Sequence, residues 1–291
     1  MNIKPFFLNK FLLAGIILAL CSCSSSENSN SEKEEVKVSM DEVIVDETEE
    51  VTIDFVMPSP LQVASIFKRA GLTFAQELPN NPENVTNYSS QLSKALNFGI
   101  YAADLSYCVL NNKSQESIDY MKAVKQLSDD LGMTSVFGNS DIFSSFEANV
   151  ANEDSMIYIL ATVQENLDEH LESNEEQYLS VVFFAGGWTE GMYIGSKVAE
   201  EGNHTVTIRL VEQMVILENM IEALELYPHQ SNALDNIIGD LKEIDNMYKN
   251  FEAIKRQKTE HISFDDVTLT DEELKAVSAK IETLRTKIVN G

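Results

Sequence analysis

Residues 179–195 read LSVVFFAGGWTEGMYIG, and the fold prediction starts from this segment. Drawn as a helix it is apolar on nearly every face, which is typical of a helix at the centre of a domain. Gly187, Gly191 and Gly195 are four residues apart and therefore share one face. Each costs about 1 kcal/mol relative to alanine in a helix, so close packing against another backbone is expected to offset that cost. A ligand groove or a flexible joint along the same face are the alternatives.

A second central helix is predicted from residues 96–107, which read LNFGIYAADLSY. Each of the two segments carries one acid with a tyrosine three residues later, Asp104 before Tyr107 and Glu190 before Tyr193. This spacing puts acid and phenol on one side of a helix. A buried carboxylate needs a partner, and Arg209, on the largely apolar segment 205–226, is the predicted cation.

The polar residues of these segments have three interpretations. The favoured one is a satisfied polar network that sets how the helices pack. The second is a ligand or cation pocket lined by Asn97, Asp104, Tyr107, Trp188, Glu190, Tyr193 and Arg209. The third is acid–base chemistry by the paired carboxylates, which would need burial together with a bound substrate.

Apolar residues at helical spacing predict helices over most of the chain from residue 61. The predicted ranges are 61–70, 88–110, 117–131, 141–150, 155–171, 176–199, 205–226, 233–254 and 272–289. Ser59 before Pro60 is a good helix start, Ser114 is a cap for the third range, and Thr270 with Glu273 forms a capping box. Short connections favour antiparallel neighbours. The predicted fold is all-α, an antiparallel multi-helix bundle of about eight or nine helices. Residues 51–55 and 262–269 could also pair as a small two-strand element beside the bundle, and the sequence does not decide this.

The first 22 residues are typical of a secretory signal peptide. Lys4 and Lys10 precede or flank an apolar run over residues 11–20, and a small residue, Ser22, stands before the expected cleavage point. The run is too short to span about 30 Å of hydrocarbon. Residues 20–23, Leu-Cys-Ser-Cys, resemble a bacterial lipobox. The resemblance implies a lipid on Cys23, and Cys23 fits better than Cys21 because Ser22 is then the small residue at the cut.

The predicted organisation is therefore a signal peptide (1–22), a lipidated cysteine with an acidic tether (23–54) and a helical bundle domain (55–291). The tether has low hydrophobicity and many acids, a composition that predicts disorder. Acid soon after a lipidated cysteine resembles a surface-export signal of Bacteroidota-type lipoproteins. A solvated spacer that holds the domain off the membrane is the alternative.

The net charge, the cysteine count and the absence of catalytic motifs argue against several classes of function. The formal net charge of −26 argues against binding nucleic acid or anionic lipid headgroups, whereas basic partners or metal cations remain compatible. Cys108 is the only cysteine beyond the signal region, so no intramolecular disulfide is expected and an inert buried thiol is predicted. No phosphate loop, HExxH, CxxC or serine elbow occurs. No catalytic residue, metal site or cofactor is therefore predicted.

Three segments together resemble an uncharacterised family of Bacteroidota helical lipoproteins. They are residues 55–64 (FVMPSPLQVA), 95–105 (ALNFGIYAADL) and 186–191 (GGWTEG). The resemblance runs from about residue 55 to the C-terminus. It implies a helical fold and a place in the cell envelope, and it transfers no activity.

Three functions follow as hypotheses. The favoured one is a binding or scaffold module anchored in the cell envelope, facing the periplasm or the cell surface, with the outer membrane preferred. Its partners would be the membrane, through the lipid, and another envelope protein. The alternatives are a bundle that binds a small ligand or cation in its central polar pocket, and a hydrolase-like enzyme that uses the paired carboxylates.

Overall fold

The structure, a computed structural model, describes residues 57–138, 141–226, 231–260, 263 and 267–291. All regular structure within these residues is helical, which confirms the predicted all-α bundle. The first half of the expected two-strand element, residues 51–55, lies outside the described residues, as do 262 and 264–266. Val267 and Leu269 are buried in an irregular segment that belongs to no strand.

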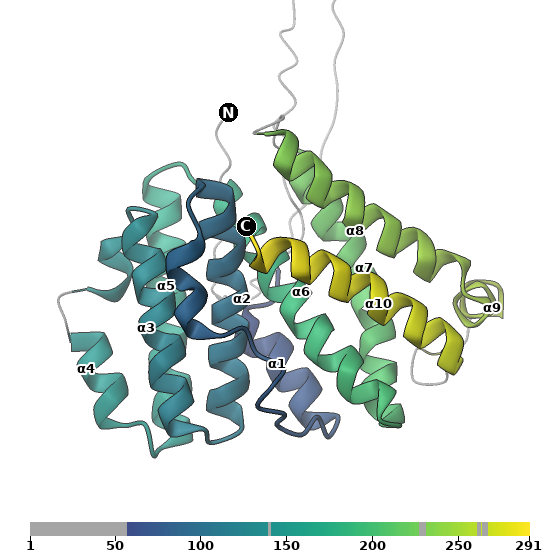
Figure 1. The fold of residues 1–291 in the computed structure, drawn as a ribbon, viewed down its shortest axis with the longest axis horizontal. Helices are drawn as coiled ribbons and strands as arrows, with labels where there is room; N and C mark the ends of the chain where they lie inside the picture. The colour runs from purple at the N-terminus through teal and green to yellow at the C-terminus, as the bar shows by residue number, and fades with distance from the viewer. Residues whose placement is uncertain (1–56, 139–140, 227–230, 261–262, 264–266) are drawn as a thin grey trace, which may run out of the picture. The chain divides into compact units, whose positions relative to one another are not determined.

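The helices are named in chain order in Figure 1. They are α1 (Pro60–Arg69), η1 (Pro82–Asn87), α2 (Gln91–Leu110), α3 (Ser114–Asp130), η2 (Thr134–Phe137), α4 (Asp141–Ala148), α5 (Glu153–Ser173), α6 (Tyr178–Glu200), α7 (His204–Glu225), α8 (Asn232–Asn250), α9 (Glu252–Glu260) and α10 (Asp271–Val289), with η marking 3₁₀ helices.

Two helix starts follow directly from the sequence. At α1 the Ser59 hydroxyl accepts a hydrogen bond from the Gln62 amide (3.3 Å), while the Gln62 side chain accepts one from the Ser59 amide (2.7 Å). At α10, Thr270 and Glu273 exchange the same pair of bonds. These capping boxes satisfy backbone donors that would otherwise be unpaired, so both predicted starts are confirmed.

Three predicted boundaries are wrong for local reasons. The range 233–254 is two helices, because Phe251 adopts extended backbone (φ −64°, ψ 136°) and its ring packs edge-on against Tyr248. Ser114 is the first residue of α3 rather than a cap, and its hydroxyl donates to the Val150 carbonyl. The range 88–110 begins later, at Gln91, because Ser90 caps α2.

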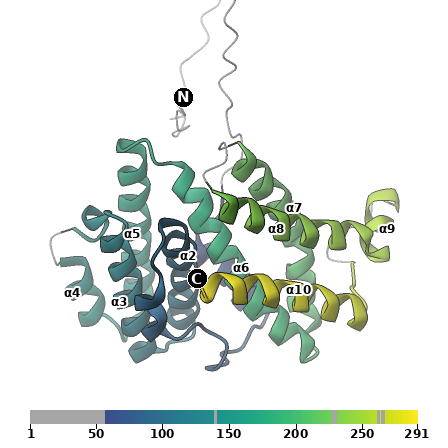
Figure 2. The ribbon, with the colours of Figure 1, turned by 45° about the horizontal axis from the view of Figure 1, so that its top comes forward.

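The centre of the bundle is the pair α2 and α6. Both contact α1 and α10, while α3 packs on α2 and α7 on α6. In Figures 1 and 2, α3, α4 and α5 lie on one side of this pair and α7, α8, α9 and α10 on the other. The aromatic core follows the pair, with the Phe98 and Phe183 rings 4.7 Å apart. In the described part of the chain no helix is both long enough and apolar enough to cross a membrane.

Candidate functional site

Two glycines let the central helices touch. A Cβ atom built on Gly186 would lie 1.9 Å from the Leu96 carbonyl oxygen, and one on Gly99 would lie 1.9 Å from the Phe183 carbonyl oxygen. No real Cβ fits at such a distance, so only glycine permits this crossing. The close approach brings the next turns of α2 and α6, which carry Asp104 and Glu190, face to face.

The predicted glycine face lies along the same side of α6. A Cβ on Gly187 would lie 3.2 Å from the Gly99 carbonyl oxygen, one on Gly191 3.2 Å from Val63, and one on Gly195 2.9 Å from the Phe67 ring. These three glycines therefore pack against α2 and then α1. The tightest contacts of the crossing belong to Gly186 and Gly99, which the four-residue spacing does not single out.

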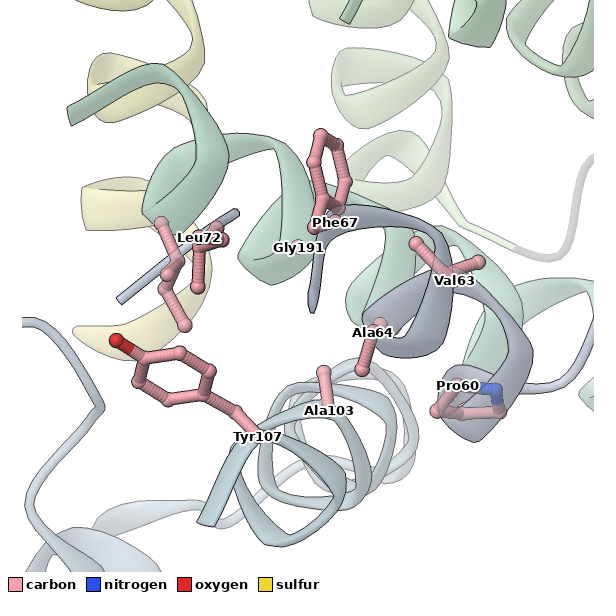
Figure 3. A pocket seen from close by; sticks show the side chains of 10 residues that line it. Pro60, Val63, Ala64, Phe67, Leu72, Ala103, Tyr107 and Gly191 are labelled. Carbon is pink, nitrogen blue, oxygen red and sulfur yellow. The ribbon is translucent and has the colours of Figure 1, made fainter. Parts of the chain in front are cut away.

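A small cavity remains where α1 crosses this face (Figure 3). Its volume is about 20 Å³, and its walls are side chains of α1, α2 and α6 with Leu72. A cavity needs roughly 10–15 Å³ to hold one water molecule, so this space has room for about one and for no larger ligand. The Tyr107 ring lines it, but the Tyr107 hydroxyl is occupied: it accepts from the Ala75 amide (2.7 Å) and donates to the Thr73 carbonyl (2.8 Å).

Glu190 forms a buried ion pair with Arg285 of α10. Arg285 Nε donates to Glu190 Oε2 (2.9 Å) and Nη2 donates to Oε1 (3.0 Å), a two-point contact. The Glu190 side chain is 0% exposed and that of Arg285 14%. The guanidinium also donates to the Leu78 carbonyl and lies 4.6 Å from the centre of the Tyr193 ring. Burial acts to lower the pKa of Arg285, but the charge and hydrogen bonds of Glu190, together with the charge of Asp104, outweigh burial and raise that pKa.

Asp104 adjoins this pair without a cation of its own. It is 0% exposed, its Oδ2 accepts from the Asn80 amide (3.1 Å), and its Oδ1 has no hydrogen-bond partner among the described residues. Burial, and then the charge of Glu190, raise the pKa of Asp104 well above its usual range, against the lowering effect of Arg285. The Asp104–Glu190–Arg285 cluster is thus an acid pair with a single positive charge.

The other predicted pocket residues are spread around this cluster in structural roles. Asn97 donates to the Ile288 carbonyl (2.9 Å) and so holds the end of α10. Trp188 is fully buried, and its indole nitrogen finds no hydrogen-bond partner among the described residues. Burial raises the pKa of Tyr107 to about 12. Of these residues, Tyr107 lines the small cavity described above, which has room for about one water molecule.

The prediction that Arg209 is the cation at the buried acids is wrong. The Arg209 guanidinium pairs with Glu212 on α7 (2.5 Å), and the cation at the acid pair is Arg285. The sequence does carry a signal for Arg285: residues 274, 278, 281, 285 and 288 follow one another at helical spacing, so Arg285 falls within the buried stripe of α10. For the loop contacts of Asn80 and Leu78 the sequence carries no such signal.

The described part of the chain shows neither a metal-binding cluster nor a reactive thiol. No group of three or more histidine, cysteine, aspartate or glutamate side chains there is arranged to hold a metal ion. Cys108 is buried and free, and burial raises the pKa of its thiol, so the thiolate form is disfavoured.

Comparison with known proteins adds no assignment. No family model matches the chain, and neither a curated protein nor a solved structure does. The functional argument therefore rests on the residues themselves.

The cluster is closed. Its two acids are fully buried, and its cation is supplied by the chain's own α10. The charge of Glu190 acts on Asp104 where α2 packs against α6, but joint acid–base chemistry needs a substrate between or beside the two carboxyl groups. The geometry supports a structural role, a polar junction where α2, α6 and α10 meet.

Proposed function

We propose that the protein is a lipid-anchored module of the cell envelope that binds another envelope protein through the outer surface of its helical bundle. The observation that carries this proposal is the closed centre. The central acids are 0% exposed, and the cavity between α1, α2 and α6 has a volume of about 20 Å³. Recognition is then left to the surface. The lipobox-like residues before Cys23 supply the anchor, on the membrane side of the acidic tether.

The outward face of α5 is the contact surface that we infer. Tyr158 is 74% exposed, the most exposed of the large apolar side chains in the described residues. Asp154, Ala161, Glu165 and Asp168 are exposed at helical spacing along the same stripe. Tyrosine is frequent among the residues that dominate binding energy at protein interfaces, so Tyr158 is the expected anchor.

The charge around this stripe indicates the kind of partner. Between Lys125 and Lys197 the sequence contains no lysine or arginine, although it contains many acids. The negative potential of α4 and α5 is therefore not balanced by cations from their own part of the chain. A partner with a basic surface complements it, and such complementarity speeds association and excludes acidic competitors.

Photo-crosslinking of the full-length, lipidated chain in its own cells tests the proposal. A photoreactive benzoyl-phenylalanine is placed at position 158, and the matched control is the exposed position 246 on α8. Irradiation is expected to give one discrete protein adduct at position 158 and none at position 246. Because exposed charges are screened beyond a Debye length of about 8 Å at 0.15 M salt, added salt should weaken the adduct. Equal labelling at both positions, or no discrete adduct at position 158, would contradict the proposal.

A further inference from the structure

The Asp104–Glu190–Arg285 cluster has an unbalanced charge if both acids are ionised. Two carboxylates and one guanidinium sum to a net charge of −1, and both carboxylates are 0% exposed to solvent. Removing an uncompensated charge from water costs several kcal/mol. Either a second positive charge must lie near the cluster, or one of the two acids must be neutral.

The elements around Asp104 offer no second cation among the described residues. The titratable groups that interact with it are Tyr101, Tyr107 and Cys108 on its own helix, Tyr120 on α3, Glu190 on α6 and Arg285 on α10. Phenols and thiols are neutral in this setting, since burial raises the pKa of each of them. Arg285 is the only positive charge of the set, and it is engaged by both oxygens of Glu190.

The hydrogen bonds of the two acids differ in a way that a proton explains. Glu190 has an N–H donor on each oxygen. Asp104 has a donor on Oδ2, from Asn80, and the described residues supply none to its buried Oδ1. A buried acceptor without a donor is destabilising, whereas a protonated carboxyl oxygen becomes a donor itself. Glu190 is the adjoining carboxylate that can accept from it.

We propose that Asp104 is a neutral carboxylic acid in the folded protein, hydrogen-bonded through Oδ1 to Glu190. The stability of the α2–α6–α10 junction then depends on this proton, and therefore on pH. With the proton in place the cluster is neutral: Asp104 carries no charge, and Glu190 and Arg285 cancel. Loss of the proton to solvent leaves a buried charge of −1 and two facing carboxylates, which weakens the junction that holds α10. This inference goes beyond the proposed function and does not depend on it.

The sign of the pH dependence follows from the direction of the shift. The pKa of Asp104 is raised in the folded protein, while in the unfolded chain it is about 3.9. The folded state therefore binds one more proton than the unfolded state between these two values. The contribution of Asp104 to stability is complete below about pH 4 and falls as pH rises towards the folded pKa, tenfold in the folding equilibrium constant per pH unit.

The test is equilibrium unfolding of the full-length chain in urea from pH 5 to 9, with Asp104→Asn beside the wild type. Asparagine keeps the shape and has an amide donor for Glu190, but it does not titrate. The folding constant of Asp104→Asn divided by that of the wild type is expected to rise tenfold per pH unit until the folded pKa is reached. A ratio that stays constant over this range overturns the proposal.

Asp240→Asn is the matched control. Asp240 forms ion pairs with Lys280 and Lys287. Burial acts to raise its pKa, but the two lysines outweigh this and lower it. The stability that Asp240 contributes is therefore present above pH 4 and lost only in acid. The ratio for Asp240→Asn is expected to stay flat from pH 5 to 9.

A second measurement covers the case in which Asp104→Asn does not fold. Carbon-13 NMR of the wild-type chain labelled at aspartate carboxyl carbons should show one aspartate still protonated at pH 7. Ionised signals from every aspartate would overturn the proposal. Where Asp104→Asn does fold, a rise in the wild-type melting temperature on addition of sodium or calcium that this variant lacks would also overturn the proposal, because the balancing charge would then be a bound metal cation.

Discussion

The contact between α2 and α6 can be tested by a single methyl group. Gly186→Ala adds a Cβ whose position in the structure is 1.9 Å from the Leu96 carbonyl oxygen. A carbon–oxygen contact is normally about 3.3–3.6 Å, so the two helices must separate by more than an ångström or bend. Neither side can yield cheaply, because the neighbouring atom is backbone rather than the end of a flexible side chain.

The size of the effect follows from two opposing terms. Overpacking a close-packed core costs about 1–3 kcal/mol, occasionally more, and a backbone clash belongs at the upper end of that range. Alanine recovers about 1 kcal/mol through its better helix propensity. A net loss of about 2 kcal/mol in unfolding free energy is expected for Gly186→Ala.

Two other glycines provide the controls. Gly239 in α8 is exposed, with no atom within 4 Å of a built Cβ, so Gly239→Ala should gain about 0.5–1 kcal/mol. Gly187→Ala, with a Cβ 3.2 Å from the Gly99 carbonyl oxygen, should lie between the two. Urea unfolding followed by far-ultraviolet circular dichroism is the suitable assay. Tryptophan fluorescence is less suitable because the single tryptophan, Trp188, adjoins two of the substitutions, which could change its signal directly. A Gly186→Ala protein as stable as Gly239→Ala would refute the proposed backbone contact.

Two further predictions concern the buried ion pair and the anchor. Arg285→Met should lower the free energy of unfolding by about 3–5 kcal/mol, because Glu190 remains buried without its cation. Adding Glu190→Gln should restore much of the loss. Lys287→Met removes one cation from a partly exposed pair in which Asp240 keeps Lys280, so it should cost no more than about 1 kcal/mol. Failure of Glu190→Gln to rescue would show that Arg285 acts through packing instead of charge. Cys23→Ala should abolish lipid labelling and release the chain from membranes in cell fractionation, whereas unchanged labelling would move the lipid to Cys21 or exclude it.

Much of the fold could be predicted because its signals are local. Capping boxes at Ser59 and Thr270 depend on residues three positions apart, and apolar spacing identifies helices without knowledge of their neighbours. The boundaries that failed depend on contacts elsewhere. Phe251 breaks a continuous helical pattern where its ring meets Tyr248, and Ser114 turns to a carbonyl 36 residues away.

The candidate site was predicted in part for the same reason. Asp104 and Glu190 stand out because each is an acid inside an apolar helical segment, and the structure brings them together. Their cation could not be chosen from the sequence. Arg209 and Arg285 both lie on helices with a buried face, and only the packing of α10 against α6 puts Arg285, 95 residues from Glu190 in the chain, within hydrogen-bonding distance.

From the sequence one can tell that the chain is helical, that segments 96–107 and 179–195 are central, and that the two acids in them need a compensating partner when buried. Helix propensity, capping and apolar spacing act within a few residues, so they can be read along the chain. The packing of the helices sets which backbones touch, at Gly99 and Gly186, which arginine compensates Glu190, and that the acid pair is closed to solvent. These three features depend on contacts between helices that are distant in sequence. Backbone shape and buried charge at such contacts can be known only once the helices are packed together.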